Sequence, residues 1–258
     1  MLVLDFIKYW FTSDNAHGIH SPFVFDLYTR IIKPDLKFYI FDDIEHCRDS
    51  MLISDKKIVV NDFGAGSKKN NSREKSIRQV ASVSLKPAKI GKLLFKMVNE
   101  FQTKTIFDLG TSLGITTMYL AGADRQNTVF TFEGCENIAA VAESNFKKLN
   151  FKNIHQTIGN LDETLELMVD KTKTIDLVFF DANHKLEPTI RYFDICLEKI
   201  NENSVFIFDD IYWSEEMKKA WETIKNHPSV TLSIDLFEVG LIFFRKESLE
   251  KQHFKLKF

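Results

Sequence analysis

The sequence predicts an α/β fold in which helices cover both faces of a mostly parallel sheet of seven strands. After about residue 87, apolar runs typical of buried strands alternate regularly with helical patterns. The run IFDLGTSLGITTMYL, residues 106–120, has the pattern of a strand, a glycine-containing turn and a helix. The last run, VTLSIDLFEVGLIFFR, holds two strands around a short turn, so we expect the sheet to end in an antiparallel hairpin.

Individual elements follow from the same patterns. Two helical stretches, about 2–12 and 21–32, precede a polar and irregular region without internal repeats. We therefore predict a helical N-terminal extension or lid at residues 1–86 and an α/β core at residues 87–258. In the core we expect strands at 104–109, 128–133, 153–158, 175–180, 203–209, 230–236 and 239–245, and helices at about 87–100, 114–122, 135–149, 160–170, 185–199 and 214–226.

Composition narrows the class of protein. The chain has 258 residues, a formal net charge of −2 and no broad basic region, so nothing in its composition indicates nucleic-acid binding. Three scattered cysteines are too few for a disulfide framework or a zinc site. The apolar start MLVLDFIKYWF is short and is interrupted by Asp5 and Lys8, unlike a signal peptide or a membrane span. We expect a cytoplasmic protein, with most of its 24 phenylalanines in the core.

The turn after the first core strand is the strongest binding signal. Its pattern is D-x-G-x-x-x-G-x-T, from Asp108 through Gly110 and Gly114, and differs from the dinucleotide pattern G-x-G-x-x-G. An acidic strand end would repel a pyrophosphate, so the ligand should lack phosphates and carry positive charge, as S-adenosylmethionine does. The residues expected to hold it are Asp108, Gly110, Thr111, Ser112, Gly114 and Thr116. The alternative is a plain strand-to-helix turn.

A second acidic strand end supports this interpretation. Glu133 ends the next strand, 25 positions after Asp108, where a carboxylate can accept hydrogen bonds from both ribose hydroxyls. Alone, Glu133 could equally be a solvated strand-end carboxylate. A similar glycine-rich run at 57–67, KIVVNDFGAGS, lacks a following strand that ends in an acid, so we interpret it as a polar loop that could fold over the cofactor site.

Three more carboxylates follow the fourth and fifth core strands. Asp181 follows the apolar residues of the run IDLVFFDANH, and Asp209 and Asp210 follow those of SVFIFDDIYW. Adjacent parallel strands bring these ends to one edge of the sheet, where clustered like charges repel unless a cation joins them. Oxygen ligands suit a hard ion such as Mg²⁺. Without a metal, Asp209 would be a buried strand-end acid and Asp210 a helix cap.

Residues 104–245 resemble the Rossmann-like core of class I S-adenosylmethionine-dependent methyltransferases, and among these the metal-dependent, catechol O-methyltransferase-like subgroup. The resemblance implies that Asp181, Asp209 and Asp210 hold the metal, although the family often has Asn at the position of Asp210. That extra carboxylate could favour Ca²⁺ or Mn²⁺, or could point elsewhere. Asp181 would also take part in cofactor binding and catalysis.

The same resemblance assigns roles to loop residues. The segment after the third strand, with Asn160 and Leu161, would pack against or bond the adenine; the sequence alone makes Asn160 a helix N-cap. His184 lies where the family usually carries a lysine as general base, and histidine titrates near neutral pH. Apart from the resemblance, Trp213 and Tyr212 follow the acidic pair in the sequence, where they would form a wall for the substrate or belong to the core.

One further pair of residues resembles a metal motif. His17 and His20 are spaced like a pair on a helix, but Gly18 and Pro22 interrupt that helix. Ser21 followed by Pro22 is instead a good helix start. We therefore expect the two histidines to be structural or substrate-facing and not zinc ligands.

The function expected from these residues is methyl transfer from S-adenosylmethionine to a small-molecule hydroxyl of a catechol or diol, assisted by Mg²⁺. The alternatives are a metal-independent methyltransferase of the same fold, a non-methylating nucleotide-binding or NAD-dependent protein, and a non-catalytic interaction module. We expect no nucleic-acid or membrane partner. The Phe-rich strands or the two N-terminal helical stretches could support a homodimer.

Overall fold

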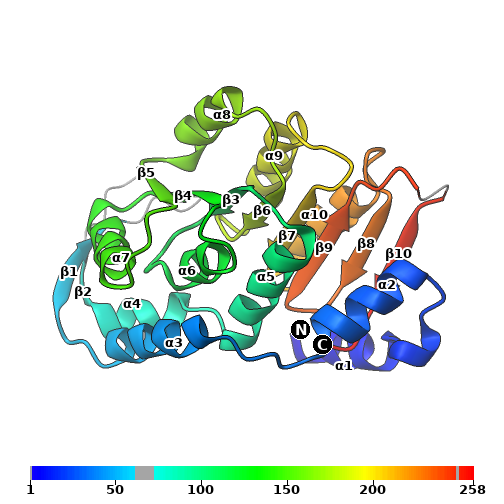
Figure 1. Cartoon of the computed structure of the whole chain (residues 1–258), viewed down its shortest axis with the longest axis horizontal. Helices are drawn as coiled ribbons and strands as arrows, with labels where there is room; N and C mark the ends of the chain where they lie inside the picture. The colour runs from blue at the N-terminus through cyan, green and yellow to red at the C-terminus, as the bar shows by residue number, and fades with distance from the viewer. Residues whose placement is uncertain (1, 62–72, 248–249) are drawn as a thin grey trace. The chain divides into compact units, whose positions relative to one another are not determined.

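The computed structural model describes residues 2–61, 73–247 and 250–258 (Figure 1). These residues form two compact units, one of residues 36–170 and the other of residues 1–35 with 171–258. The chain passes from one unit to the other after residues 35 and 170, and not at residue 86. The domain boundary predicted after residue 86 therefore stays a prediction. None of the described helices is long and apolar enough to cross a membrane.

The unit of residues 36–170 contains three parallel strands in the order β3-β4-β5. Its elements are α3 (Tyr39–Leu52), β1 (Lys57–Val60), β2 (Arg73–Ser76), α4 (Ile77–Ser84), α5 (Ala88–Phe101), β3 (Thr105–Leu109), α6 (Ile115–Gly122), β4 (Thr128–Glu133), α7 (Glu136–Lys148), β5 (Ile154–Ile158) and α8 (Leu161–Lys171). β1 and β2 form a separate antiparallel pair inside the region predicted to be helical. The glycine-rich part of the run at 57–67 lies largely outside the described residues.

The other unit contains the strands β10-β8-β9-β7-β6 in that order. Its elements are α1 (Leu2–Thr12), a 3-10 turn (Ala16–Gly18), α2 (Pro22–Leu27) with a π-helical turn (Tyr28–Ile32), β6 (Leu177–Phe180), α9 (Leu186–Leu197), β7 (Val205–Asp209), α10 (Glu215–Lys225), β8 (Leu232–Asp235), β9 (Val239–Phe243) and β10 (Gln252–Lys255). β8 and β9 form the predicted antiparallel hairpin, and β9 also pairs antiparallel with β7. β10, which the sequence pattern did not predict, pairs parallel with β8.

Buried strands and capped helices explain why these segments adopt these structures. Every residue of β6, β7 and β9 is buried, as their continuous apolar runs require. Ser21 caps α2 with Pro22 in its first turn, as predicted. Ser214 caps α10 by accepting a hydrogen bond from the Met217 N–H, and thereby ends the loop that follows β7. The loop after β7 is thus fixed at both ends, by the buried strand and by the Ser214 cap.

The two ends of the chain belong to one unit. Asp14 forms an isolated parallel bridge with Leu256, and the Lys257 N–H donates to the carbonyl of Asp14 at 3.0 Å. The Tyr9 hydroxyl donates to the Leu256 carbonyl and the Tyr28 hydroxyl to the Lys257 carbonyl. The N-terminal helices are therefore anchored by the last residues of the chain.

Candidate functional site

The loop between β3 and α6 has the conformation that its glycines predict. Gly110 and Gly114 adopt positive φ values of 121° and 83°, and Ser112 adopts 48°. A Cβ on Gly114 would lie 2.5 Å from Phe146 Cε1, so a side chain is excluded by both conformation and space. The loop therefore turns tightly into α6, with Gly114 as the residue before the helix. Backbone groups at such a turn can approach a ligand closely.

Asp108 is fully buried at the end of β3 and accepts hydrogen bonds from residues of the same unit. Its Oδ2 accepts hydrogen bonds from Thr117 Oγ1 at 2.6 Å and from Thr131 Oγ1 at 2.8 Å. Thr111 Oγ1 lies 2.6 Å from Thr131 Oγ1 and extends the network. Buried carboxylates need such partners because desolvation is costly. The network ties β3 to β4 and to the first turn of α6.

Glu133, at the end of β4, lies directly beside this loop. Its Oε2 accepts from the Ser112 N–H and its Oε1 from the Cys135 N–H, both at 2.9 Å. Burial raises the pKa of Glu133, while these N–H groups and that of Gly134 oppose the increase. The structure thus brings together the two acidic strand ends that the sequence singled out, through one glycine-containing loop.

The segment after β5 reaches the same edge of this unit. The Gly159 N–H donates to the Glu133 carbonyl at 3.0 Å, and Gly159 has a φ of 143°. Asn160 caps the start of α8, with its Oδ1 accepting from the Asp162 N–H at 3.1 Å, as the sequence alone predicted. Leu161 is buried, and Thr116 is half-buried in the first turn of α6. The predicted cofactor residues of this unit therefore lie on three neighbouring strand ends.

A second cluster lies in the other unit, after β6 and β7. Asp181, His184 and Asp209 each offer one ligand atom, and these atoms lie within 4.8 Å of one another. His184 Nε2 is 3.2 Å from Asp181 Oδ1. Asp209 is buried, whereas Asp181 and His184 are half-buried. Two carboxylates and an imidazole are a donor set that fits a divalent cation.

The loop that carries His184 has an unusual backbone. Asn183 and His184 both have positive φ values, 63° and 39°. The Asn183 side chain donates to the Tyr192 hydroxyl at 2.5 Å, which ties the loop to α9. Non-glycine residues in this region are held there only by surrounding contacts, and they concentrate at functional sites. The conformation turns His184 back toward Asp181.

Asp210 occupies a different position from its neighbour Asp209. It has a φ of 55°, its N–H donates to the Glu238 carbonyl at 2.8 Å, and its carbonyl accepts from the Trp213 N–H at 2.9 Å. Among the described residues, the group that could hold a metal contains His184 and not Asp210. Asp210 as a metal ligand stays a prediction. His17 and His20, both exposed, are likewise outside that group.

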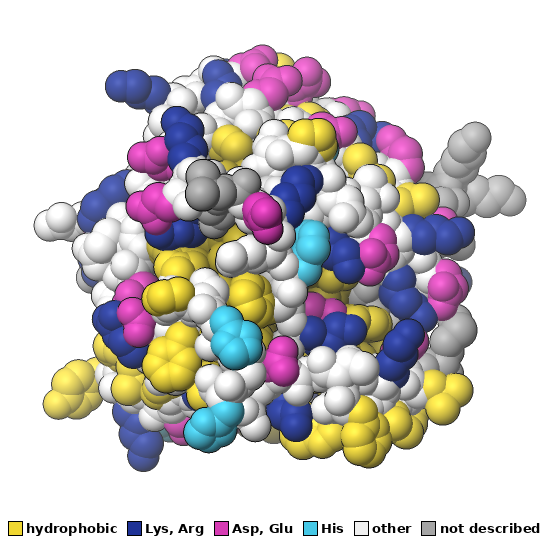
Figure 2. All heavy atoms as spheres, turned by 90° about the vertical axis from the view of Figure 1, so that its right-hand side faces the viewer, with side chains coloured by type: hydrophobic (Ala, Val, Ile, Leu, Met, Phe, Trp, Pro, Cys, Tyr) yellow, Lys and Arg dark blue, Asp and Glu magenta, His cyan; other side chains and the backbone are white. Residues whose placement is uncertain are grey.

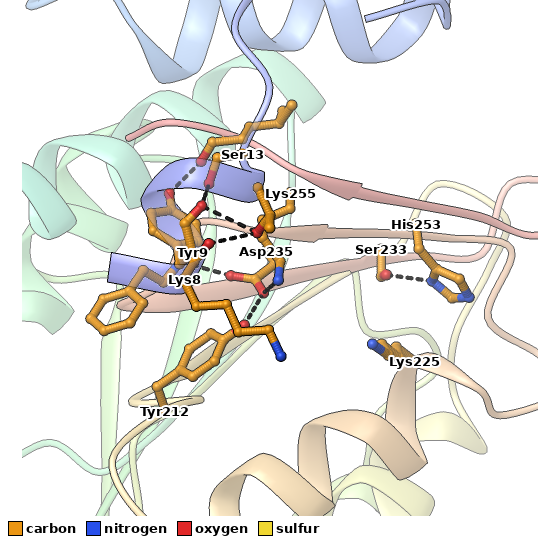
Figure 3. Close-up of polar contacts among 12 residues, drawn as sticks. Lys8, Tyr9, Ser13, Tyr212, Lys225, Ser233, Asp235, His253 and Lys255 are labelled. Atoms are coloured by element: carbon orange, nitrogen blue, oxygen red, sulfur yellow. Dashed lines mark hydrogen bonds and ion pairs between the residues drawn. The ribbon is translucent and has the colours of Figure 1, made fainter. Parts of the chain in front are cut away.

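Tyr212 and Trp213 differ in their surroundings. The Tyr212 hydroxyl donates to Asp235 Oδ2 at 2.6 Å (Figure 3). The Tyr212 ring stacks on that of Phe237, with the two ring centroids 4.9 Å apart. Burial raises the pKa of Tyr212, and the Asp235 carboxylate raises it further. Trp213 is 65% exposed. Tyr212 therefore anchors the loop after β7 to β8, and Trp213 is the ring that is available to a ligand.

Sequence reasoning did not single out two residues that support these sites. Thr131 faces Asp108 directly across β3 and β4 in the strand register. Asp235 holds Tyr212 from the end of β8. The register of the parallel strands could have identified Thr131, because it places the two side chains on the same face.

A family model described as a methyltransferase domain matches residues 107–211. That range starts within β3 and ends just after β7, and so it includes both clusters. Residues 107–211 are a methyltransferase domain. The predicted resemblance to class I methyltransferases is thereby confirmed.

One curated relative matches part of this methyltransferase domain. A tRNA (guanine-N(7)-)-methyltransferase from Mycoplasma mobile is 29% identical over 109 residues, which are 42% of this chain and 51% of that protein. The chain thus spans about half the length of the curated relative that it matches.

Solved structures share the fold over much more of the chain. A putative O-methyltransferase from Klebsiella pneumoniae is 16% identical, with a TM-score of 0.60, over 86% of this chain and 96% of that one. An O-methyltransferase from Bacillus cereus in complex with SAH is 17% identical, with a TM-score of 0.58, over 82% and 93%. A putative caffeoyl-CoA O-methyltransferase from Staphylococcus aureus is 19% identical, with a TM-score of 0.57, over 64% and 88%. Identities this low show a shared fold, and they confirm the predicted Rossmann-like α/β class.

Proposed function

We propose that this protein is an S-adenosylmethionine-dependent O-methyltransferase that acts on a small molecule with adjacent hydroxyl groups and uses a divalent metal ion. The observation that carries the proposal is that the carboxylates of Asp181 and Asp209 lie together, with His184 beside Asp181, inside a methyltransferase domain. Solved proteins of the same fold include O-methyltransferases. A net charge of −2 favours a small acceptor over tRNA, the substrate named for the curated relative.

Residues 36–170 would bind the cofactor. The Glu133 carboxylate would accept hydrogen bonds from the ribose hydroxyls, because it is buried and held beside the loop by the Ser112 N–H. The turn at Gly110 and Gly114 would let backbone N–H groups approach the methionine portion. Asp108 would support the binding loop from within the unit, because its Oδ2 already accepts hydrogen bonds from Thr117 and Thr131.

Asp181 and Asp209 would hold the metal ion, and His184 would accept the proton of the reacting hydroxyl. When bound, a divalent ion lowers the pKa of a coordinated hydroxyl and fixes its direction. A proton on His184 Nε2, which faces Asp181 Oδ1, leaves Nδ1 to accept the hydroxyl proton. Asp181 would thereby orient the imidazole, as a carboxylate does for other histidine bases. Trp213 would cover a flat substrate.

A thermal-shift matrix tests the cofactor and the metal separately. S-adenosylhomocysteine should raise the melting temperature, and Mg²⁺ or Mn²⁺ should add to that shift in the presence of a catechol. Asp209→Asn should abolish the metal-dependent part and keep the cofactor part. Asp194→Asn, an exposed carboxylate on α9, is the matched control and should behave as the wild type. A shift with S-adenosylhomocysteine that no cation alters would favour the metal-independent methyltransferase.

A further inference from the structure

Helix α1 is apolar on both of its faces. Among residues 2–12, only Tyr9 is buried, although the helix contains a single acidic and a single basic residue, Asp5 and Lys8. A surface helix normally directs one apolar stripe to the core and polar residues to solvent. On α1 the outward positions are Val3, Leu4, Ile7, Trp10 and Phe11, whose spacing forms a second apolar stripe opposite Tyr9.

The helix is held firmly by its inner face. Phe6 and Tyr9 pack on Phe237, with ring centroids at 5.0 and 5.2 Å, and Tyr9 also bonds the Leu256 carbonyl. Lys218 Nζ lies 2.7 Å from Asp5 Oδ2. Figure 3 shows Tyr9 on the inner face of the helix. The outward stripe is therefore presented in one orientation by several contacts of the same unit.

The exposed area of this stripe is large for a solvent-facing surface. Val3 and Leu4 are 70% and 71% exposed and Phe11 is 82% exposed, with Ile7 and Trp10 nearly half exposed. Figure 2, which faces the side of the unit that carries α1, α2 and β10, shows hydrophobic side chains gathered along its lower edge. The stripe offers on the order of 600 Å² of apolar surface, which is at the upper end of the range for the largest apolar patch on a monomeric protein. Two such surfaces joined reach about 1,200 Å², the lower bound of a stable interface.

We infer that the outward stripe of α1 is the interface between two copies of this chain. The stripe is self-complementary, with the aliphatic Val3 and Leu4 at one end, the aromatic Trp10 and Phe11 at the other, and Ile7 between. A two-fold axis near Ile7 places the aliphatic end of each copy against the aromatic end of the other. A membrane-surface helix would instead carry a polar face rich in lysine and arginine, which α1 lacks.

Sedimentation velocity of the full chain over a wide concentration range tests this interface. The wild type should form a dimer, and Phe11→Glu should raise its dissociation constant at least about tenfold, because it places a charge against the aliphatic end of the second copy's stripe. Val83→Glu on α4 is the matched control, because Val83 is also 82% exposed. It should leave the dimer unchanged, and circular dichroism should show both variants folded.

A cysteine at the axis provides an independent readout. Ile7→Cys should form an interchain disulfide under copper–phenanthroline oxidation, because a residue on a two-fold axis meets its own copy, whereas Val83→Cys should not. The three native cysteines are buried and do not compete. A monomer at every concentration, a dimer that Phe11→Glu leaves intact, or a monomer that binds phosphatidylcholine vesicles through α1 would each overturn the inference. None of these outcomes depends on methyl transfer.

Discussion

His184 Nε2 lies 3.2 Å from Asp181 Oδ1, across a loop in which two non-glycine residues have positive φ. The pair holds the His184 imidazole beside the carboxylate that follows β6, and Asp209 at the end of β7 completes the cluster. This arrangement gives each residue a distinct role under the proposed function. The carboxylates would hold the cation, and the imidazole, oriented by Asp181, would take the proton.

Removing the imidazole should slow the chemical step without weakening cofactor binding. We expect His184→Gln to lower kcat by about 100-fold or more, the usual contribution of a general base. The Kd for S-adenosylhomocysteine should change by less than about twofold, because that cofactor is held by other residues. Steady-state kinetics and calorimetric titration measure the two quantities. His46→Gln, an exposed histidine on α3, should alter neither; equal kcat in the two variants would remove His184 from catalysis.

Glu133 should make cofactor binding depend on pH. Burial raises the pKa of Glu133 above its ordinary value, and ribose hydroxyls that donate to the carboxylate favour its ionised form. The affinity for S-adenosylhomocysteine should therefore be constant well above this raised pKa and fall as the pH drops through it. Glu133→Gln should lower the affinity about 10- to 100-fold at neutral pH and flatten the profile. Calorimetry at a series of pH values tests this, with Glu136→Gln as the exposed control.

The threonines around Asp108 should matter for stability. Thr131→Val removes a hydrogen bond to a fully buried carboxylate, and we expect it to lower the free energy of unfolding by about 2 kcal/mol. Thr223→Val, at an exposed position on α10, should change it by less than about 0.5 kcal/mol. Urea titrations provide both numbers. Equal stability of the two variants would mean that the Asp108 network does not hold the loop.

Gly114 should not tolerate a side chain. Gly114→Ala combines a φ of 83° with a Cβ position 2.5 Å from a ring atom of Phe146, and we expect a loss of about 3 kcal/mol in the free energy of unfolding. Gly122→Ala, on the same helix, meets Ile40 at 3.3 Å and should cost less than about 1 kcal/mol. Thermal unfolding of the two variants should give clearly different melting temperatures; a shared value would contradict the loop geometry.

Much of the fold could be predicted because each core strand carries an uninterrupted apolar run. The patterns located β3 to β9 and predicted the hairpin of β8 and β9; in the structure the chain turns at Phe237, just before β9. They did not predict β10, because QHFK is short and largely polar. Nor did they predict that the first 35 residues form one unit with the end of the chain, since bridges such as Asp14 to Leu256 join distant segments and leave no local pattern.

The candidate site could be predicted only as far as strand ends determine it. The acids at the ends of β3, β4 and β7, with Asp181 directly after β6, were found because within each unit the parallel strands end at one edge. The roles of Asp209 and Asp210 could not be distinguished, because the positive φ of Asp210 is set by its hydrogen bond to the turn before β9. The hydrogen bond between Tyr212 and Asp235 could not be predicted either, because it joins residues that are distant in the sequence.

The most direct test of the proposed function is the rate of methyl transfer from radiolabelled S-adenosylmethionine to catechol, measured in Mg²⁺ or Mn²⁺ and again in excess chelator. We predict methylated catechol with the divalent ion and loss of the product with chelator, restored when the cation is returned. Product formation at the same rate in chelator would contradict the role assigned to Asp181 and Asp209. No transfer to catechols or sugar diols under any condition, with S-adenosylhomocysteine failing to stabilise the protein, would contradict the proposed function as a whole.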